Sequence, residues 1–357
     1  MKRIAILLVI VMFLSACKNS KSDNKSENEN TKPVSLTAAG ATFPLPFYNM
    51  AFETYTKNTE ILLTYGGIGS GGGIRSLKDK VVDFGATDAF LNQKEEAELT
   101  APIVHIPTCI GAVVIAYNLT GVEGLKLSNQ NLIDIFMGKI TKWNDAQLKA
   151  TNPGLKLPDM NISVVHRSDG SGTTYIFSDY MSKINANWEQ SVGRGKSLQW
   201  PVGMGAKGNP GVAGTIQQTV GAIGYIGSEF AFAQKIAFAQ IENSAGKYIA
   251  PSLESISASA QGEIPSDTKV MLTNSSDPNA YPISGFTWLI LYKDQNYGGR
   301  SKAQAEETVK FLSWIIEKEA QTMAQQVNYA ALPEKAVETA KEILKTVVYN
   351  GEPLIKK

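Results

Sequence analysis

The stretch Ile162-Ser-Val-Val-His-Arg-Ser-Asp-Gly-Ser-Gly-Thr-Thr-Tyr-Ile-Phe-Ser-Asp-Tyr-Met-Ser-Lys-Ile184 holds the unit from which the fold can be inferred. Residues 162–165 are mostly apolar and β-branched, which predicts a buried strand. Ile176, Tyr180 and Ile184 recur every four residues, which predicts a helix. A turn rich in glycine, serine and threonine separates the two. The unit is therefore a strand, a glycine-rich turn and a helix.

The same alternation extends outward in both directions from this unit. Further buried strands are predicted at 61–65, 81–84, 113–117 and 288–292. Helical spacing is present in three more groups of apolar residues: Phe47, Ala51 and Tyr55; Ile74, Leu77 and Val81; Val309, Leu312 and Ile316. Because strands alternate with helices, we predict an α/β fold with mainly parallel sheets.

The composition excludes several classes of protein. The 357 residues favour two domains, and 43% hydrophobic with 19% charged residues exclude both a fully disordered chain and a multi-span membrane protein. With 34 basic and 33 acidic residues, the chain lacks the basic footprint of a nucleic-acid binder. Two cysteines and two histidines argue against a disulfide framework and a zinc site. We expect no metal and no cofactor.

The N-terminus predicts export. Lys2 and Arg3 precede an apolar run at 4–14, and small residues follow before Cys17, as in a secretory signal spanning 1–16. A signal-anchor helix is the alternative, but the apolar run is short for a membrane span. Residues 18–32 include no apolar side chain, so we predict that 17–35 form a flexible tether.

Three turns carry the chemistry: Ala39-Gly-Ala-Thr-Phe-Pro44, Gly66-Gly-Ile-Gly-Ser-Gly-Gly-Gly73 and His166-Arg-Ser-Asp-Gly-Ser-Gly-Thr-Thr174. Each is predicted to precede a helix and offers free backbone N–H groups with a Ser or Thr hydroxyl, which together favour an anion. Arg167 adds a side chain that can donate to two oxygens of an oxyanion. Any one such turn can be simply a helix cap or a tight turn. Three of them in one chain favour an anion site.

Two nucleotide-binding patterns are only partly matched. Gly67-Ile-Gly-Ser-Gly-Gly72 satisfies G-x-G-x-x-G, with Asp88 at a suitable distance for a ribose contact, but that pattern alone is common. Gly195-Lys-Ser197 ends like a P-loop, although Gln190 stands where the motif requires glycine.

Candidate catalytic side chains are few. Neither Ser70 nor Ser171 lies in a G-x-S-x-G elbow. No acid spacing nominates His105 or His166 as a base, and we expect both in the core or at a rim. Cys109 lies in an apolar stretch and is expected to be a buried small hydrophobe.

The motifs resemble a known family. Gly40-Ala-Thr-Phe-Pro44, Gly67–Gly72, Val82-Asp-Phe-Gly-Ala-Thr-Asp-Ala89 and Arg167-Ser-Asp-Gly-Ser-Gly-Thr173 are similar to motifs of the phosphate-binding protein of bacterial phosphate ABC transporters. The similarity runs in order from Ser35 to the C-terminus. Leu14-Ser-Ala-Cys17 resembles the lipobox of bacterial lipoproteins, which implies a lipid on Cys17.

The resemblance implies a two-lobed periplasmic-binding-protein fold of type II, with the ligand in the cleft between the lobes. The chain would cross between lobes near Tyr117–Asn118 and near Gly285–Phe286. Lobe one would comprise 36–117 and 286–357, and lobe two 118–285.

The family's ligand pattern implies a set of phosphate-binding residues in this chain. Asp88 would accept the proton of the phosphate, Arg167 would clamp it, and Asp169 would orient the arginine. The complete implied set is Thr42, Phe43, Ser70, Asp88, Arg167, Ser171, Gly172 and Thr173. Departures from the family pattern are Gly71, Phe90 and His166.

The implied function is capture of inorganic phosphate outside the cytoplasmic membrane and its delivery to the permease of an ABC transporter. We therefore expect a monomeric binding protein and not an enzyme, held by its lipid to a membrane, in the periplasm or on the outer face of the cell. Two alternatives remain open. One is an exported phosphatase or phosphoryl-transfer enzyme using the same anion cradle, and the other is an adhesive or structural lipoprotein that keeps only the fold.

Overall fold

A computed structural model describes residues 34–355. Within this range, nine strands form one continuous sheet: β1 (Ser35–Gly40), β2 (Leu62–Gly67), β3 (Phe84–Thr87), β4 (Ile103–Tyr117), β6 (Ser163–Arg167), β7 (Met204–Ala206), β8 (Ala222–Gly227), β9 (Ala237–Phe238) and β12 (Ser284–Tyr292). Their order is β2-β1-β3-β12-β4-β8-β6-β7, with β9 paired to β4. Two small sheets complete the strands: β5 (Lys126–Leu127) with β10 (Gln240–Glu242) and β11 (Tyr248–Ile249), and β13 (Val348–Tyr349) with β14 (Glu352–Pro353).

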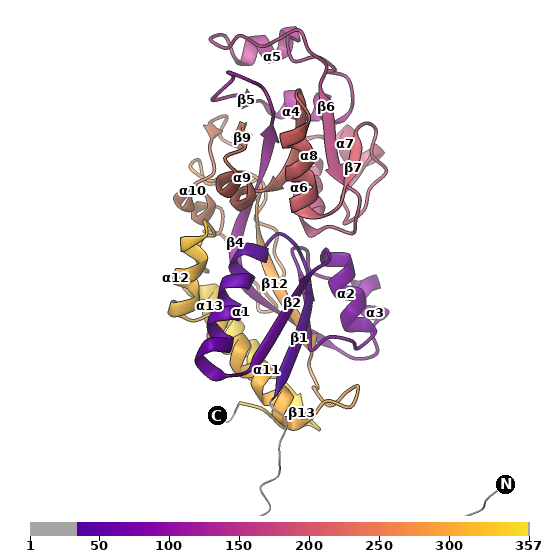
Figure 1. Cartoon of the computed structure of the whole chain (residues 1–357), viewed down its shortest axis with the longest axis vertical. Helices are drawn as coiled ribbons and strands as arrows, with labels where there is room; N and C mark the ends of the chain where they lie inside the picture. The colour runs from indigo at the N-terminus through magenta and orange to yellow at the C-terminus, as the bar shows by residue number, and fades with distance from the viewer. Residues whose placement is uncertain (1–33, 356–357) are drawn as a thin grey trace, which may run out of the picture. The chain divides into compact units, whose positions relative to one another are not determined.

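The fold has two lobes, and β4 passes through both (Figure 1). Residues 103–112 of β4 pair with β12, which continues into the parallel strands β3, β1 and β2 of lobe one. Residues 113–117 pair with β8, which continues into the parallel strands β6 and β7 of lobe two. The strand thus changes partner between Ala112 and Val113, earlier than the expected crossover near Tyr117–Asn118. The residue bounds of the lobes stay a prediction.

Helices cover the sheet in each lobe. In lobe one these are α1 (Leu45–Thr59), α2 (Ser70–Lys78), α3 (Gln93–Ala97), α11 (Lys302–Ile315), α12 (Lys318–Gln326) and α13 (Glu334–Leu344). In lobe two they are α4 (Asn129–Phe136), α5 (Ala146–Thr151), α6 (Gly172–Ile184), α7 (Ala186–Ser191), α8 (Gly208–Gln218), α9 (Ser228–Gln234) and α10 (Leu253–Ala258). None of the helices in residues 34–355 has the length and apolar character needed to cross a bilayer.

The predicted α/β class is confirmed, and each predicted helix is present as α1, α2, α6 or α11. The prediction of mainly parallel sheets was wrong, because β12 and β4 pair antiparallel with their neighbours and make the large sheet mixed. The placement of Val81 was wrong, because α2 ends at Lys78 and β3 begins only at Phe84. Lys80 adopts a left-handed φ of 58° that turns the chain, and Val81 is 68% exposed. Strands β1, β7 and β8 were not predicted from the apolar pattern.

Each lobe has its own aromatic core. Phe52 packs edge-on against Phe84 and Phe311 in lobe one, with the Phe52 and Phe311 ring centroids 4.8 Å apart. In lobe two, Phe177 stacks on Tyr225 at 4.5 Å. Burial of apolar surface is the dominant favourable term in folding, and these rings contribute to it. Each packed lobe can therefore hold its glycine-rich turns in place.

Candidate functional site

The three glycine-rich turns each lead into a helix, as predicted. Thr42 and Phe43 lie between β1 and α1, and Ser70 begins α2 directly after β2. Since β1 and β2 are parallel neighbours, their carboxyl ends bring these two turns to the same edge of lobe one. Arg167 is the last residue of β6, and Gly172 begins α6 in lobe two. All three turns therefore present helix N-termini, which favour an anion.

The turns of the two lobes touch each other. The Thr42 hydroxyl accepts hydrogen bonds from the backbone N and the Nδ2 of Asn209, both at 3.1 Å. The Ser70 hydroxyl accepts from the Gly172 N–H at 3.1 Å, and the Gly71 N–H donates to the Gly170 carbonyl at 2.9 Å. The structure is thus a closed arrangement of the lobes.

Glycine is required at two positions for this approach. A Cβ on Gly172 would lie 2.5 Å from the Ser70 hydroxyl and 2.6 Å from the Asp88 Cβ. Gly69 has a φ of 85°, in the region that side chains disfavour, and a Cβ there would lie 2.9 Å from the Gly170 carbonyl oxygen. The glycines therefore serve contact between lobes and not only tight turns.

Asp88 is an acid buried among hydrogen-bond donors. Its side chain accepts from the Thr287 hydroxyl at 2.8 Å and from the Ser70 hydroxyl at 3.4 Å, and the residue is 1% exposed. Burial raises the pKa of Asp88 to about 7, although the bond from Thr287 and the charge of Arg167 oppose that rise. A carboxyl group with this pKa can accept or hold a proton near neutral pH.

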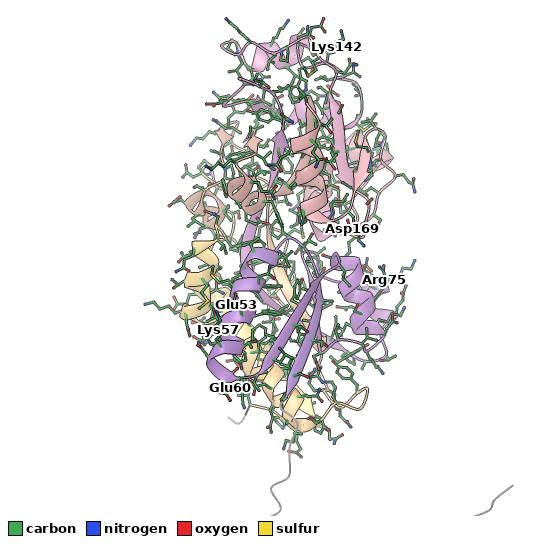
Figure 2. The ribbon with its side chains drawn as sticks, viewed as in Figure 1. Glu53, Lys57, Glu60, Arg75, Lys142 and Asp169 are labelled. Atoms are coloured by element: carbon green, nitrogen blue, oxygen red, sulfur yellow. The ribbon has the colours of Figure 1, made fainter. Side chains whose placement is uncertain are left out.

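Arg167 is fixed by an acid beside it. Its Nε and Nη2 donate to the two carboxylate oxygens of Asp169 at 2.8 and 2.6 Å, and Nη1 donates to the Thr173 hydroxyl at 3.3 Å. Burial would raise the pKa of Asp169, but its bonds to Arg167 and to the Gly208 N–H lower it overall. Asp169 is therefore ionised at neutral pH and lies on the side of lobe two that faces lobe one (Figure 2).

The structure brings most of the predicted residues into a network of two hydrogen-bonded groups between the lobes. In one group, Ser70 joins Asp88 and Gly172. In the other, Thr173 joins Arg167 and, through Asn209, also Thr42, with Asp169 paired to the arginine. Ser171 caps α6, because its hydroxyl accepts from the Thr174 N–H at 3.0 Å. Phe43 has a fully buried side chain, and its carbonyl accepts from the Tyr329 hydroxyl at 2.5 Å.

Two residues of this network were missed from the sequence. Asn209 donates from Nδ2 to the hydroxyls of Thr42 and Thr173, at 3.1 and 3.0 Å, and so links the lobes. It lies at the start of α8, in a loop-rich stretch with no apolar pattern. Thr287 is a hydroxyl residue inside the buried strand β12, and that contrast was the available signal.

The remaining candidate catalytic groups lie in other environments. Burial lowers the pKa of His105 to about 3, and its Nε2 accepts from the Leu91 N–H at 3.2 Å. His166 stacks on Trp200, with 4.8 Å between ring centroids. Cys109 is buried, as predicted, and burial raises the pKa of its thiol. Among the residues described, no group of three or more His, Cys, Asp or Glu side chains could hold a metal ion.

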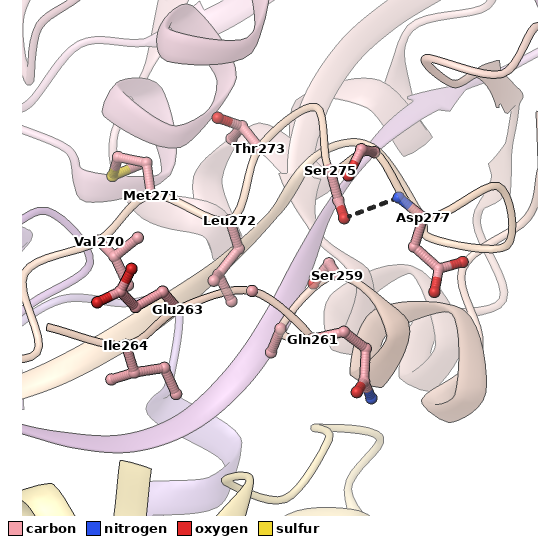
Figure 3. Close-up of a pocket in the computed structure, with 13 residues that line it drawn as sticks. Ser259, Gln261, Glu263, Ile264, Val270, Met271, Leu272, Thr273, Ser275 and Asp277 are labelled. Carbon is pink, nitrogen blue, oxygen red and sulfur yellow. Dashed lines mark hydrogen bonds between the residues drawn. The ribbon is translucent and has the colours of Figure 1, made fainter. Parts of the chain in front are cut away.

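A separate cavity of about 470 Å³ lies in the loop between Ser259 and Asp277. Its polar lining includes Glu263, Thr273 and Ser275, and the Asp277 N–H donates to the Ser275 hydroxyl (Figure 3). None of the predicted site residues lines it. The network between the lobes therefore remains the candidate site.

Comparison with known proteins agrees with this arrangement. A family model described as a PBP superfamily domain matches residues 26–319. The chain is 38% identical over 350 residues to the phosphate-binding protein PstS of Xylella fastidiosa, covering 93% of this chain and 94% of that protein. It is 39% identical over 317 residues to PstS of Haemophilus influenzae, covering 87% and 93%. The chain belongs to the PstS family of phosphate-binding proteins.

Solved structures show the same fold as this PstS family member. A phosphate-binding protein from Stenotrophomonas maltophilia has a TM-score of 0.66 at 16% identity, covering 87% of this chain and 93% of that one. A high-affinity periplasmic phosphate-binding protein bound with phosphate has a TM-score of 0.68 at 20% identity, covering 90% and 100%. These likenesses support the two-lobed periplasmic-binding-protein fold.

Proposed function

We propose that this protein captures inorganic phosphate outside the cytoplasmic membrane and delivers it to the permease of an ABC transporter. The proposal rests on the network between the lobes, in which one group joins the buried acid Asp88 to the Ser70 hydroxyl and the Gly172 N–H, and the other joins the Arg167 guanidinium to the Thr173 hydroxyl. Membership of the PstS family supports the same ligand.

The donors suit a tetrahedral oxyanion. Thr42 and Ser70 come from lobe one, whereas Arg167 and Thr173 come from lobe two. Hydrogen bonds and helix dipoles can stabilise a desolvated anion when each oxygen has a partner. A ligand held by both lobes favours the closed state, because it makes its full set of contacts only there.

Asp88 gives the site its preference for a protonated oxyanion. HPO₄²⁻ carries a proton that it can donate to the Asp88 carboxylate, whereas sulfate carries none at neutral pH. Against the ionised form of Asp88, sulfate would place an oxygen acceptor beside a buried carboxylate, which leaves a bond unmade and two like charges in contact. Sulfate could therefore bind only when Asp88 itself holds the proton, whereas phosphate brings its own. The arrangement therefore selects phosphate over an anion of equal shape and charge.

We propose capture without catalysis. Turnover of a phosphate ester needs a nucleophile, a metal or an arranged base. The Cys109 thiol is buried with a raised pKa, and His105 is buried with a pKa too low for a base at neutral pH. Neither residue therefore supports the phosphatase alternative.

We also propose that the protein is exported and anchored as a monomer through a lipid on Cys17. The signal at 1–16 and the tether at 17–35 lie, up to Pro33, outside the described residues. Support comes from the sequence pattern around Cys17. Two or more acyl chains would hold the protein at a membrane, since each buried methylene contributes about 0.8 kcal/mol.

Calorimetric titration of the purified protein with phosphate tests the function. We expect saturable binding of one phosphate, much weaker binding of sulfate, and no release of phosphate from a phosphomonoester under the same conditions. Absence of phosphate binding would contradict the capture function, and steady ester hydrolysis would favour the phosphatase alternative.

A further inference from the structure

An ion pair crosses between the lobes beside the candidate site. The Lys196 Nζ lies 2.7 and 2.8 Å from the two carboxylate oxygens of Glu95. The side chains are only 11% and 29% exposed. Neither residue belongs to the predicted phosphate-binding set, and Lys196 lies in the Gly195-Lys-Ser197 stretch to which the sequence assigned no role.

Glu95 is fixed to lobe one by contacts that do not involve Lys196. It lies in α3, and its carboxylate accepts from the Asn92 N–H at 3.0 Å while its own N–H donates to the Asn92 side chain at 2.9 Å. This reciprocal pair is a capping box. The preceding Leu91 is bonded to His105 in the lobe-one half of β4. Glu95 therefore moves with lobe one.

Lys196 is held on lobe two, next to the third turn. Its carbonyl accepts from the Ser171 N–H at 2.8 Å, and the neighbouring Gly195 N–H donates to Ser178 of α6 at 3.1 Å. Its ammonium group lies 5.7 Å from the centre of the Tyr175 ring, also on α6. Lys196 therefore moves with the helix whose first turn belongs to the predicted phosphate set.

We propose that Lys196 and Glu95 form a latch that closes the lobes over bound phosphate and slows its release without contacting it. This inference rests on the proposed function. A contact present only in the closed state raises the population of that state and hence the apparent affinity. Because both side chains are already positioned within their own lobes, little conformational entropy is lost when they meet.

A neighbouring ion pair offers a matched control. Lys269 pairs with Glu96, also on α3, and the two side chains are 22% and 35% exposed. The adjacent Thr268 donates to the His105 carbonyl at 3.2 Å and accepts from the Trp288 Nε1 at 3.2 Å, so residue 268 is attached to strands of lobe one although it lies inside the range 118–285 predicted for lobe two. Removing the Lys269 charge changes the same region without removing the Lys196–Glu95 contact.

The test measures phosphate dissociation by stopped-flow fluorescence and phosphate affinity by calorimetry, using the full chain. Lys196→Met keeps an unbranched apolar stem over Tyr175, and Glu95→Gln keeps an oxygen that can accept the Asn92 N–H. We expect each single variant to release phosphate about two- to tenfold faster, with the association rate little changed. The double variant should be no faster than the faster single variant, because both changes remove the same contact. Lys196→Arg should restore slow release.

The outcomes separate the latch from its alternatives. The melting temperature of the phosphate-free protein should be equal in wild type and in both single variants, since a contact that merely supports the fold would lower it. Unchanged release from both single variants, equal acceleration by Lys269→Met, or additive effects in the double variant would each overturn the latch. Failure of the wild-type protein to bind phosphate would instead overturn the proposed function.

Discussion

At the scale of single residues, Asp88 is an acid among the hydrogen-bond donors of the proposed phosphate site. Asp88→Asn exchanges the carboxylate for an amide of nearly the same shape, which can donate a hydrogen bond to sulfate. We expect the ratio of phosphate to sulfate affinity to narrow by at least about tenfold, or 1.4 kcal/mol. Competition titrations measure this ratio. The exposed Asp79 serves as a control, because Asp79→Asn should leave the ratio unchanged. If Asp88→Asn weakened both anions equally, the acid would only support its loop.

The raised pKa of Asp88 also predicts a pH dependence of stability. Between the ordinary aspartate pKa of 3.8 and the folded value of about 7, the folded state binds more protons than the unfolded state. The contribution of Asp88 to stability is therefore fully present below 3.8 and is lost as the pH rises through 7. Burial raises the pKa of Glu229 as well, so the pH dependence of stability in the wild-type protein combines the contributions of two acids.

Comparison of wild type with Asp88→Asn isolates the Asp88 contribution. Without phosphate, we expect wild type to lose up to a few kcal/mol of unfolding free energy relative to the variant between pH 4 and pH 8. Urea unfolding at several pH values measures the difference. Parallel profiles for the two proteins would contradict the raised pKa.

Arg167→Ala removes the guanidinium and leaves Asp169 as an unpaired charge beside the site. Hydrogen bonds to charged groups contribute about 1.5–3 kcal/mol, so phosphate affinity should fall at least about tenfold. Calorimetry at moderate salt measures the loss. Arg75 lies exposed on α2, and Arg75→Ala should bind as wild type does (Figure 2). An Arg167→Ala variant that bound phosphate with wild-type affinity would show that Arg167 does not contribute to the site.

At the scale of secondary-structure elements, the approach of α6 to α2 depends on Gly172. In Gly172→Ala the new Cβ would lie 2.5 Å from the Ser70 hydroxyl, so the lobes could not close fully. We expect phosphate affinity to fall more than about tenfold while each lobe stays folded. Gly214 provides the control, because a Cβ there meets no atom within 4 Å. Calorimetry and small-angle scattering with phosphate together report affinity and closure, and a compact Gly172→Ala with wild-type affinity would contradict the requirement.

The elements that the sequence predicted share a local origin. The strand, turn and helix around residues 162–184 follow from apolar spacing and from glycines within a short segment, and β6 and α6 match them. Asn209 and Thr287 could not be found this way, because their roles depend on partners more than 30 residues away in the chain. The pairing of Glu95 with Lys196 is hidden for the same reason. Val81 was misplaced because it fits both the helical spacing of Ile74 and Leu77 and the apolar strand pattern at 81–84. The chain turns at Lys80, so Val81 belongs to neither the helix nor the strand.

At the scale of the whole molecule, the proposed lipid on Cys17 predicts where the protein is found. Cys17→Ser removes the thiol that would receive the lipid, so the variant should fractionate as a soluble protein or remain as uncleaved precursor. Phosphate binding should be retained, because the site lies in the folded body. Cell fractionation, with mass spectrometry of the N-terminus, measures the outcome. A variant cleaved before residue 17 that stays bound to the membrane would exclude the lipid anchor.

The strand β4 also bears on how the two lobes can move relative to each other. Neighbouring strands of a sheet are twisted relative to one another, whereas sliding one strand along the other would change the register that their pairing sets. Because β4 pairs with β12 in one half and with β8 in the other, a rotation between the lobes that twists this strand would keep both registers. It works as a flexure, a joint with no sliding surfaces. We therefore expect each closure of the lobes to bring Ser70 back to the same position against Gly172. The sheet, and not the ligand, would then determine how precisely the two halves of the site meet.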